Sequence, residues 1–151
     1  LTTMMGQKER IWLWETNLQF FKDRPLLGVG WRKTEAAAHH HHLATEAGRR
    51  RFLGHAHNNL LEMLAGAGIL GALAWIVWNG YLFVFSWRRG RGQTEGARLS
   101  WAFFCAWVAL HLNGLTQVNF WEGKVLHQMM WAVGLLFGLS AIRASAPGAK
   151  R

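Results

Sequence analysis

The chain has 151 residues, of which 51% are hydrophobic, and its ten Trp and nine Phe accompany a formal net charge of +9. This apolar share exceeds what a soluble core of that size needs, so the composition argues against an ordinary cytosolic globular protein and excludes a disordered chain. The single cysteine, Cys105, excludes a disulfide within the chain and a zinc site built from cysteines. Because the chain starts at Leu1 with no signal-peptide pattern, we expect it to be a piece of a longer protein.

Residues 1–58 form the first segment, which is basic. Near its start, apolar side chains recur at helical spacing, at Ile11, Trp14, Leu18 and Phe21. This spacing predicts an amphipathic helix over about residues 9–22, at or leaving the membrane interface. Pro25 ends that helix, and the stretch that follows lacks sustained periodicity, so we expect a loop with one short helix.

Three apolar stretches follow, and each is compared with the roughly 20 residues that cross about 30 Å of hydrocarbon. The first has no charged residue between Met63 and Phe85, so it predicts a transmembrane helix over residues 59–87. The second and third predict shorter transmembrane helices over residues 99–115 and 125–142. The sequence therefore predicts an all-α integral membrane protein.

The basic residues set the expected orientation of these helices. The connection at 88–98 carries four arginines against one acid, and the tail at 143–151 is also basic. Since basic loops favour the cytoplasm, both are expected there, with residues 1–58 and 116–124 on the outer side. Segment 1–58 has nine Lys and Arg residues of its own, which calls for an anionic partner such as a lipid phosphate or diphosphate. Contact with membrane headgroups explains that charge equally well.

The residues around His57 are the most informative for chemistry. Asn59 followed by Glu62 fits a capping box, which predicts that the first transmembrane helix begins directly after Asn59. His57 and Asn58 would then lie beside unpaired backbone N–H groups, which favour an anion and disfavour a protonated imidazole. A neutral histidine beside an anion could act as a general base toward a hydroxyl. The alternative is a polar helix cap, in which His55 and His57 are hydrogen-bonded to the loop.

Four consecutive histidines occupy positions 39 to 42. Such a run suggests metal binding, but no second cluster with ligand spacing accompanies it, so a solvated loop is favoured. A functional alternative stays open, namely a non-enzymatic membrane protein, such as a carrier or sensor. It would bind a metal through His39, His40, His41, His42, His55 and His57.

His57 and Asn58 are followed, after nine residues, by Gly68 and, three positions on, by Gly71. This H-N-x9-G-x-x-G spacing resembles the signature of the bacterial O-antigen ligase and polymerase family. The two glycines, one helical turn apart, are expected to permit close helix packing rather than to contact substrate. Two upstream stretches resemble the family's large periplasmic loop, Arg10-Ile11-Trp12, with Trp14 as the alternative aromatic residue, and Pro25-Leu26-Leu27-Gly28-Val29-Gly30. The segment 114–120 is similar to the C-terminal end of these proteins.

The resemblance implies a polytopic membrane glycosyltransferase of the C type. This chain would supply its C-terminal transmembrane helices and periplasmic loop, roughly the last third. Such an enzyme acts in the bacterial inner membrane with its active site facing the periplasm, which makes residues 1–58 and 116–124 periplasmic. It moves a glycan from undecaprenyl diphosphate to a sugar hydroxyl, on lipid A–core in a ligase or on another glycan in a polymerase. The expected partners are the lipid-linked donor, the acceptor and membrane lipids, with no nucleic acid, metal or other cofactor.

The same resemblance assigns roles to individual residues. His57 matches the family's essential histidine, expected to activate the acceptor hydroxyl, and Arg10 matches a loop arginine expected to hold the donor diphosphate. Arginine suits that role because its guanidinium pairs with phosphate oxygens and stabilises the charge on a leaving diphosphate. Beyond the resemblance, substrate binding is expected for Asn58, Arg24 and His55. Asn58 could instead orient His57, and for Arg24, whose substrate would be acceptor phosphates, contact with membrane headgroups is the favoured alternative.

Overall fold

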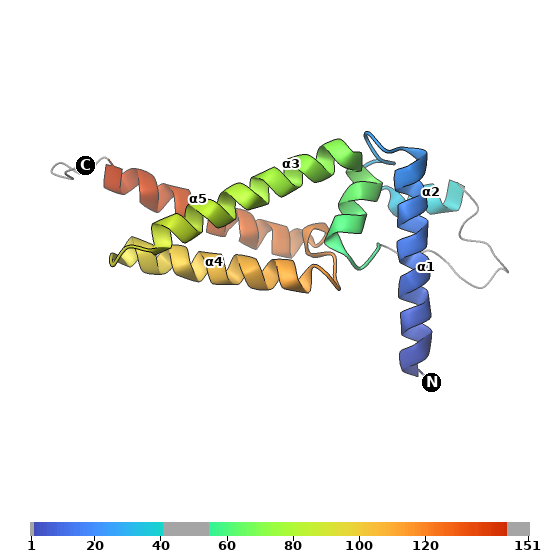
Figure 1. The fold of residues 1–151 in the computed structure, drawn as a ribbon, viewed down its shortest axis with the longest axis horizontal. Coiled ribbons are helices and arrows are strands. Elements are labelled where there is room, and N and C mark those ends of the chain that lie inside the picture. Colours follow the sequence, from blue (N-terminus) through green and yellow to red (C-terminus); the bar gives the residue numbers. More distant parts are fainter. Residues whose placement is uncertain (1, 41–54, 145–151) are drawn as a thin grey trace.

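The computed structural model describes residues 2–40 and 55–144, and every regular element in them is helical (Figure 1). In chain order the elements are α1 (Thr2–Asp23), α2 (Thr34–His40), α3 (Asn59–Gly90), α4 (Glu95–Asn113), the short 3-10 helix η2 (Asn119–Trp121) and α5 (Gly123–Ala144). The all-α prediction is thus confirmed for the described residues. α1 starts earlier than the helix predicted over residues 9–22.

α3, α4 and α5 form an elongated bundle, and α1 runs across one end of it (Figure 1). α4 packs on α3 and on α5, while α1 packs on α3, with α2 beside both. The turn that joins α4 to α5 lies at the same end of the bundle as α1. The start of α3, this turn and α1 therefore meet in one region, while the turn between α3 and α4 lies at the opposite end.

α3 is broken at Gly68, whose φ of 65° is left-handed. Four hydrogen bonds join the preceding loop to the break: Val29 N–H to Ala65 O (2.8 Å), Gly30 N–H to Gly66 O (2.9 Å), Ile69 N–H to Pro25 O (2.8 Å) and Leu70 N–H to Leu26 O (3.4 Å). The loop thus satisfies backbone groups that the break leaves without helical partners. A Cβ at Gly68 would collide with the backbone of Leu26. The prediction that this glycine serves the packing of one helix on another is therefore wrong, because its neighbour is a loop.

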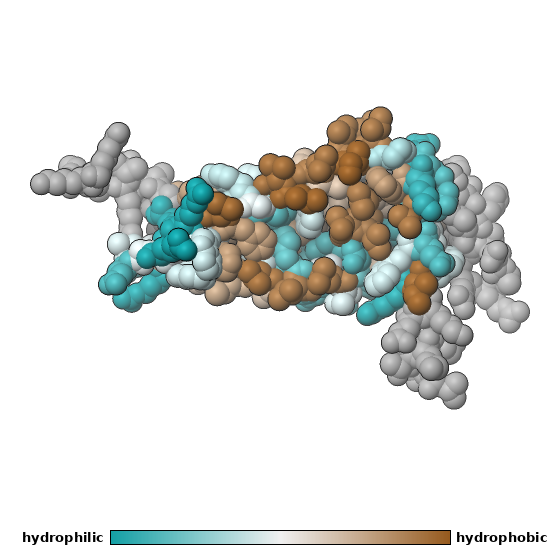
Figure 2. Space-filling model, viewed as in Figure 1, coloured by the Kyte–Doolittle hydropathy of each residue, from teal (hydrophilic) through white to brown (hydrophobic). Residues whose placement is uncertain are grey.

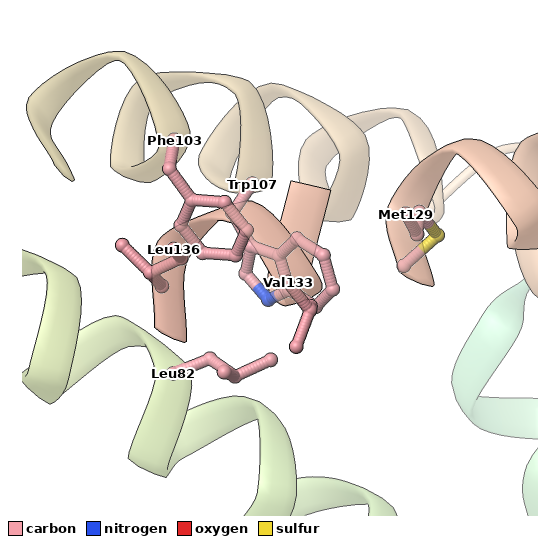
Figure 3. Packing of buried hydrophobic residues seen from close by; sticks show 6 residues of the cluster. All are labelled: Leu82, Phe103, Trp107, Met129, Val133 and Leu136. Carbon is pink, nitrogen blue, oxygen red and sulfur yellow. The ribbon is translucent and has the colours of Figure 1, made fainter. Parts of the chain in front are cut away.

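The centre of the bundle is filled by apolar side chains from α3, α4 and α5 (Figure 3). They are Leu82, Phe103, Trp107, Met129, Val133 and Leu136. One polar pair is buried with them, since Trp107 Nε1 donates to Asn79 Oδ1 at 3.1 Å. The Asn79 side-chain nitrogen in turn donates to the Trp75 carbonyl at 2.6 Å. These bonds satisfy the strongly polar side chain of an otherwise apolar helix stretch.

Apolar side chains also cover much of the outer surface of the bundle (Figure 2). On α3 the exposed ones include Leu70, Leu73, Ile76, Val77, Trp78, Tyr81 and Val84. Only 28% of the most apolar stretch of α3 is buried, whereas the core helix of a soluble protein would be mostly buried. Among the residues that the structure describes, α3 is the one helix long and apolar enough to cross a membrane. Membrane crossing by α4 and α5 stays a prediction.

Candidate functional site

The start of α3 differs from the sequence-based expectation by one residue. Asn58 is the N-cap, because its backbone is extended and its side-chain oxygen accepts from the amides of Leu60 and Leu61 at 3.0 and 3.1 Å. Asn59 already lies in the helix, and the Glu62 side chain has other partners. The prediction of a capping box at Asn59 and Glu62 is therefore wrong.

The four amides that open α3 all have partners. Asn58 accepts three of them, from Leu60 and Leu61 through its side chain and from Glu62 through its carbonyl at 3.0 Å. The fourth, from Asn59, donates to the Gly114 carbonyl at 2.8 Å. The expectation of unpaired N–H groups that bind an anion at this helix end is therefore wrong. An anionic substrate would need cationic side chains instead.

His57 directly precedes the cap and is contacted on two sides. Its φ of 50° is left-handed, a conformation that a residue with a side chain adopts where its surroundings impose it. Its Nδ1 lies 3.1 Å from the side-chain oxygen of Gln117, in the turn between α4 and α5. The ring of His55 meets the His57 ring edge-on, with the centroids 4.4 Å apart and the planes at 79°. The His57 ring is half-buried, so it is held in place and still accessible.

His55 is half-buried beside His57. Burial lowers the pKa of His55 from its ordinary value of 6.5, and the neighbouring His57 lowers it further because two imidazolium charges would repel each other. His55 is therefore neutral at neutral pH. A neutral His55 ring packs against the His57 ring without repelling a positive charge on His57.

Glu62 is a site residue whose actual partners the sequence did not indicate. It is 1% exposed, and its two carboxylate oxygens bind two different segments. Oε1 accepts from the hydroxyl of Thr34, at the start of α2, and Oε2 accepts from the amide of Ala56, each at 2.9 Å. Ala56 lies between His55 and His57, and residues 55–57 are called the histidine segment below. Glu62 therefore links both this segment and α2 to α3.

The turn after α4 closes against the start of α3 through a second set of contacts. The Asn58 side-chain nitrogen donates to the Leu115 carbonyl at 3.1 Å, and the backbone amide of Asn119 donates to the Asn59 side-chain oxygen at 2.9 Å. Gly114 permits this close approach, because a Cβ there would fall on the Asn59 side-chain nitrogen. The turn is thereby fixed beside the histidine segment.

α1 reaches the same segment through Trp14. Its indole nitrogen donates to the Ala56 carbonyl at 2.9 Å, so Trp14 contacts the histidine segment. Trp12 packs on a cluster made by Leu13, Phe20, Ala38 and Ala65. Arg10 is exposed and lies one helical turn before Trp14, about 6 Å along the helix axis and on the same face. Arg10 thus lies about one helical turn along α1 from the residue that contacts the histidine segment.

Arg24 is not brought to this region by the described contacts. It is exposed and follows the end of α1, about 15 Å along the axis from Trp14. Asn58 uses both ends of its side chain inside the protein, one in the cap and one at Leu115.

The histidine tract falls largely where the structure gives no description. His41, His42 and the basic positions 49–51 lie outside the described residues, and for His39 and His40 only the backbone of α2 is described. In the two described ranges, no three His, Cys, Asp or Glu side chains are placed to hold a metal ion.

The region where α1, the start of α3 and the turn after α4 meet can therefore offer an accessible imidazole and an exposed guanidinium. The sequence model of the O-antigen ligase family matches residues 3–76, which include Arg10, Trp14, His57 and the break in α3. No curated protein matches the chain. Residues 3–76 are therefore similar to the O-antigen ligase family, a likeness that implies glycan transfer of the ligase or polymerase type.

Proposed function

We propose that this protein transfers a glycan from undecaprenyl diphosphate to a sugar hydroxyl, with His57 as the general base and Arg10 as the diphosphate-binding residue. The observation that carries the proposal is the His57 ring, held by Gln117 and His55 in a segment that Glu62 and Trp14 anchor. A base needs this kind of fixed geometry, because its contribution depends on hydrogen-bond reach to the proton that it removes.

The proposed reaction is an inverting displacement at the anomeric carbon of the donor sugar. The acceptor hydroxyl oxygen bonds to that carbon while the bond from carbon to diphosphate oxygen breaks and its electron pair leaves with the diphosphate. The hydroxyl proton passes to His57. Arg10 stabilises the negative charge that develops on the diphosphate, since a guanidinium forms two parallel hydrogen bonds to phosphate oxygens. The occupied N–H groups of α3 leave this role to cationic side chains.

Asn58, His55 and Arg24 receive different roles in this proposal. Asn58 is assigned to the support of the loop, because its side chain is already engaged at both ends. His55 is assigned to the packing of His57 and to the wall of the acceptor site. Arg24, remote from the histidine segment, is assigned to phosphate groups at the membrane surface.

The membrane arrangement is part of the proposal. α4 and α5 have 19 and 22 residues, and at about 1.5 Å per residue such helices approach the thickness of a bilayer core. α1 runs across the end of the bundle with Ile11, Trp14 and Leu18 exposed, as suits a helix lying in the interface (Figure 1). Hydrophilic residues gather where α3 joins α4, in the basic connection 88–98 (Figure 2). We therefore propose three spans in the bacterial inner membrane, with His57 on the periplasmic side.

The test is glycan transfer in the bacterium that encodes this chain, with substitutions in its own gene. His57→Ala and His57→Asn are compared, because asparagine tolerates a left-handed φ and keeps the backbone unstrained. Both variants, and Arg10→Ala, are expected to abolish transfer on gels of surface glycans. Matched controls are His127→Ala and Arg98→Ala, which change exposed residues of α5 and α4 and should leave the glycan pattern unchanged. Normal glycans in the His57→Asn strain would refute the proposed base.

The same gels separate ligase from polymerase. Loss of capped bands with polymer accumulating on undecaprenyl diphosphate indicates a ligase, whereas loss of the ladder with single units retained indicates a polymerase. Metal bound stoichiometrically after chelator washing, together with an active His57→Ala variant, would instead favour the metal-binding protein.

A further inference from the structure

Gln117 lies outside the matched residues 3–76, and the similarity of segment 114–120 assigns it no role, yet it contacts the proposed base. We infer that Gln117 is the positioning residue that fixes the tautomer and orientation of His57. The inference rests on the proposed function. It adds that the catalytic geometry is completed by the turn between α4 and α5, a part of the chain that the family match does not cover.

The chemistry of the contact determines which nitrogen is free to act. The Gln117 side-chain oxygen is an acceptor, so the His57 Nδ1 that lies 3.1 Å away must donate and therefore carries the proton. In a neutral imidazole the other nitrogen, Nε2, then holds the lone pair. Nε2 is thus the atom that accepts the proton of the acceptor hydroxyl.

The position of Gln117 is set by the backbone around it rather than by its own long side chain. Its amide donates to the Asn113 carbonyl at 3.0 Å, which continues the last turn of α4. On either side of Gln117, the turn is bonded to Asn58 through Leu115 and to Asn59 through Asn119. Since Asn58 and Asn59 directly follow His57, these bonds hold the backbone of Gln117 beside His57 before substrate binds, which keeps its side-chain oxygen within reach of the imidazole.

A neutral amide suits this site better than a carboxylate. A carboxylate at the same place would favour the protonated imidazole, which cannot act as a base. It would also add negative charge beside a site proposed to bind a diphosphate. Gln117 therefore gives the orientation that an acid gives in other histidine sites, without the charge.

The test uses the complete protein purified in detergent, a lipid-linked donor and Gln117→Met, which keeps the length of the side chain and removes the acceptor. We expect kcat to fall by about tenfold to a hundredfold, because loss of orientation of a catalytic group costs that much, while KM is little changed. Gln117→Glu should restore an acceptor and move the low-pH limb of the activity profile to higher pH. Gln128→Met, an exposed glutamine of α5, is the matched control and should behave as the unaltered protein.

A direct readout of the tautomer is the pair of 15N chemical shifts of the His57 ring, identified by its absence from His57→Asn. We expect protonated Nδ1 in the unaltered protein and a mixture of tautomers in Gln117→Met. Unprotonated Nδ1 in the unaltered protein, or an unchanged kcat in Gln117→Met, would overturn the inference. If instead His57→Asn is fully active, the proposed function fails, so the two failures are distinguishable.

Discussion

The carboxylate of Glu62 is predicted to hold the histidine segment in place, and Glu62→Leu removes it. The side chain is 1% exposed, and its two partners, the Ala56 amide and the Thr34 hydroxyl, belong to residues that are both 0% exposed. Leucine fills most of the same space but accepts no hydrogen bond. Both partners are therefore left buried without an acceptor.

The expected loss follows from these two orphaned groups. A buried donor left unsatisfied costs about 1–3 kcal/mol, so Glu62→Leu should lower the free energy of unfolding by about 2–6 kcal/mol. Glu62→Gln should cost far less. Its amide oxygen can still accept from Ala56, and its nitrogen can donate to the Thr34 hydroxyl, which can act as an acceptor. Thr34→Val removes one of the two bonds and should fall between these variants.

The measurement is unfolding of each purified variant in detergent, followed by the helical circular dichroism signal against denaturant. The same preparations are assayed for glycan transfer, which should decline in the same order because the histidine segment loses its anchor. Equal stability of Glu62→Leu and the unaltered protein would show that the two hydrogen bonds of Glu62 do not stabilise the fold. A Glu62→Gln variant as unstable as Glu62→Leu would show the same, because glutamine can still make both hydrogen bonds.

Three further predictions concern the same region. Gly68→Ala should lower the free energy of unfolding by at least about 1–2 kcal/mol for the left-handed φ alone, with more from the collision with the loop, and denaturant unfolding measures it. Trp14→Phe keeps an aromatic side chain but leaves the Ala56 carbonyl without its donor, so it should lower the free energy of unfolding by about 0.5–1.5 kcal/mol and reduce transfer. Trp78→Phe, on the exposed face of α3, should do neither. The lowered pKa of His55 means that the folded state binds fewer protons than the unfolded state near pH 6.5, so stability should fall as the pH drops through that value. His55→Gln should lose this part of the pH dependence.

The helices and the motif positions could be predicted from the sequence because both depend on local patterns. A long apolar stretch without charge between Met63 and Phe85 leaves few alternatives to a helix. The spacing from His57 to Gly68 is likewise a property of the sequence alone. The apolar pattern does not distinguish a glycine at which a second helix packs from a glycine that breaks its own helix. At Gly68 the deciding partner is a loop more than 35 residues earlier in the chain.

The errors at the start of α3 have a similar cause. Asn58 and Asn59 are equally good caps by residue type, and the choice between them depends on Gly114, whose carbonyl takes the Asn59 amide. Glu62 fits a capping box by spacing, but its oxygens bind Thr34 and Ala56 once α2 packs beside it. Segment 114–120 resembles the C-terminal end of the family, but no local pattern indicates that Gln117 contacts His57, because the two residues are 60 positions apart.

His57 is tested most directly as the base by the rate of glycan transfer of the purified complete protein carrying His57→Asn, with the lipid-linked donor and acceptor saturating. General base catalysis contributes about a hundredfold or more, so His57→Asn should reduce the rate by at least that factor in a protein that stays folded. A rate equal to that of the unaltered protein would mean that the imidazole between Gln117 and His55 has no part in the reaction.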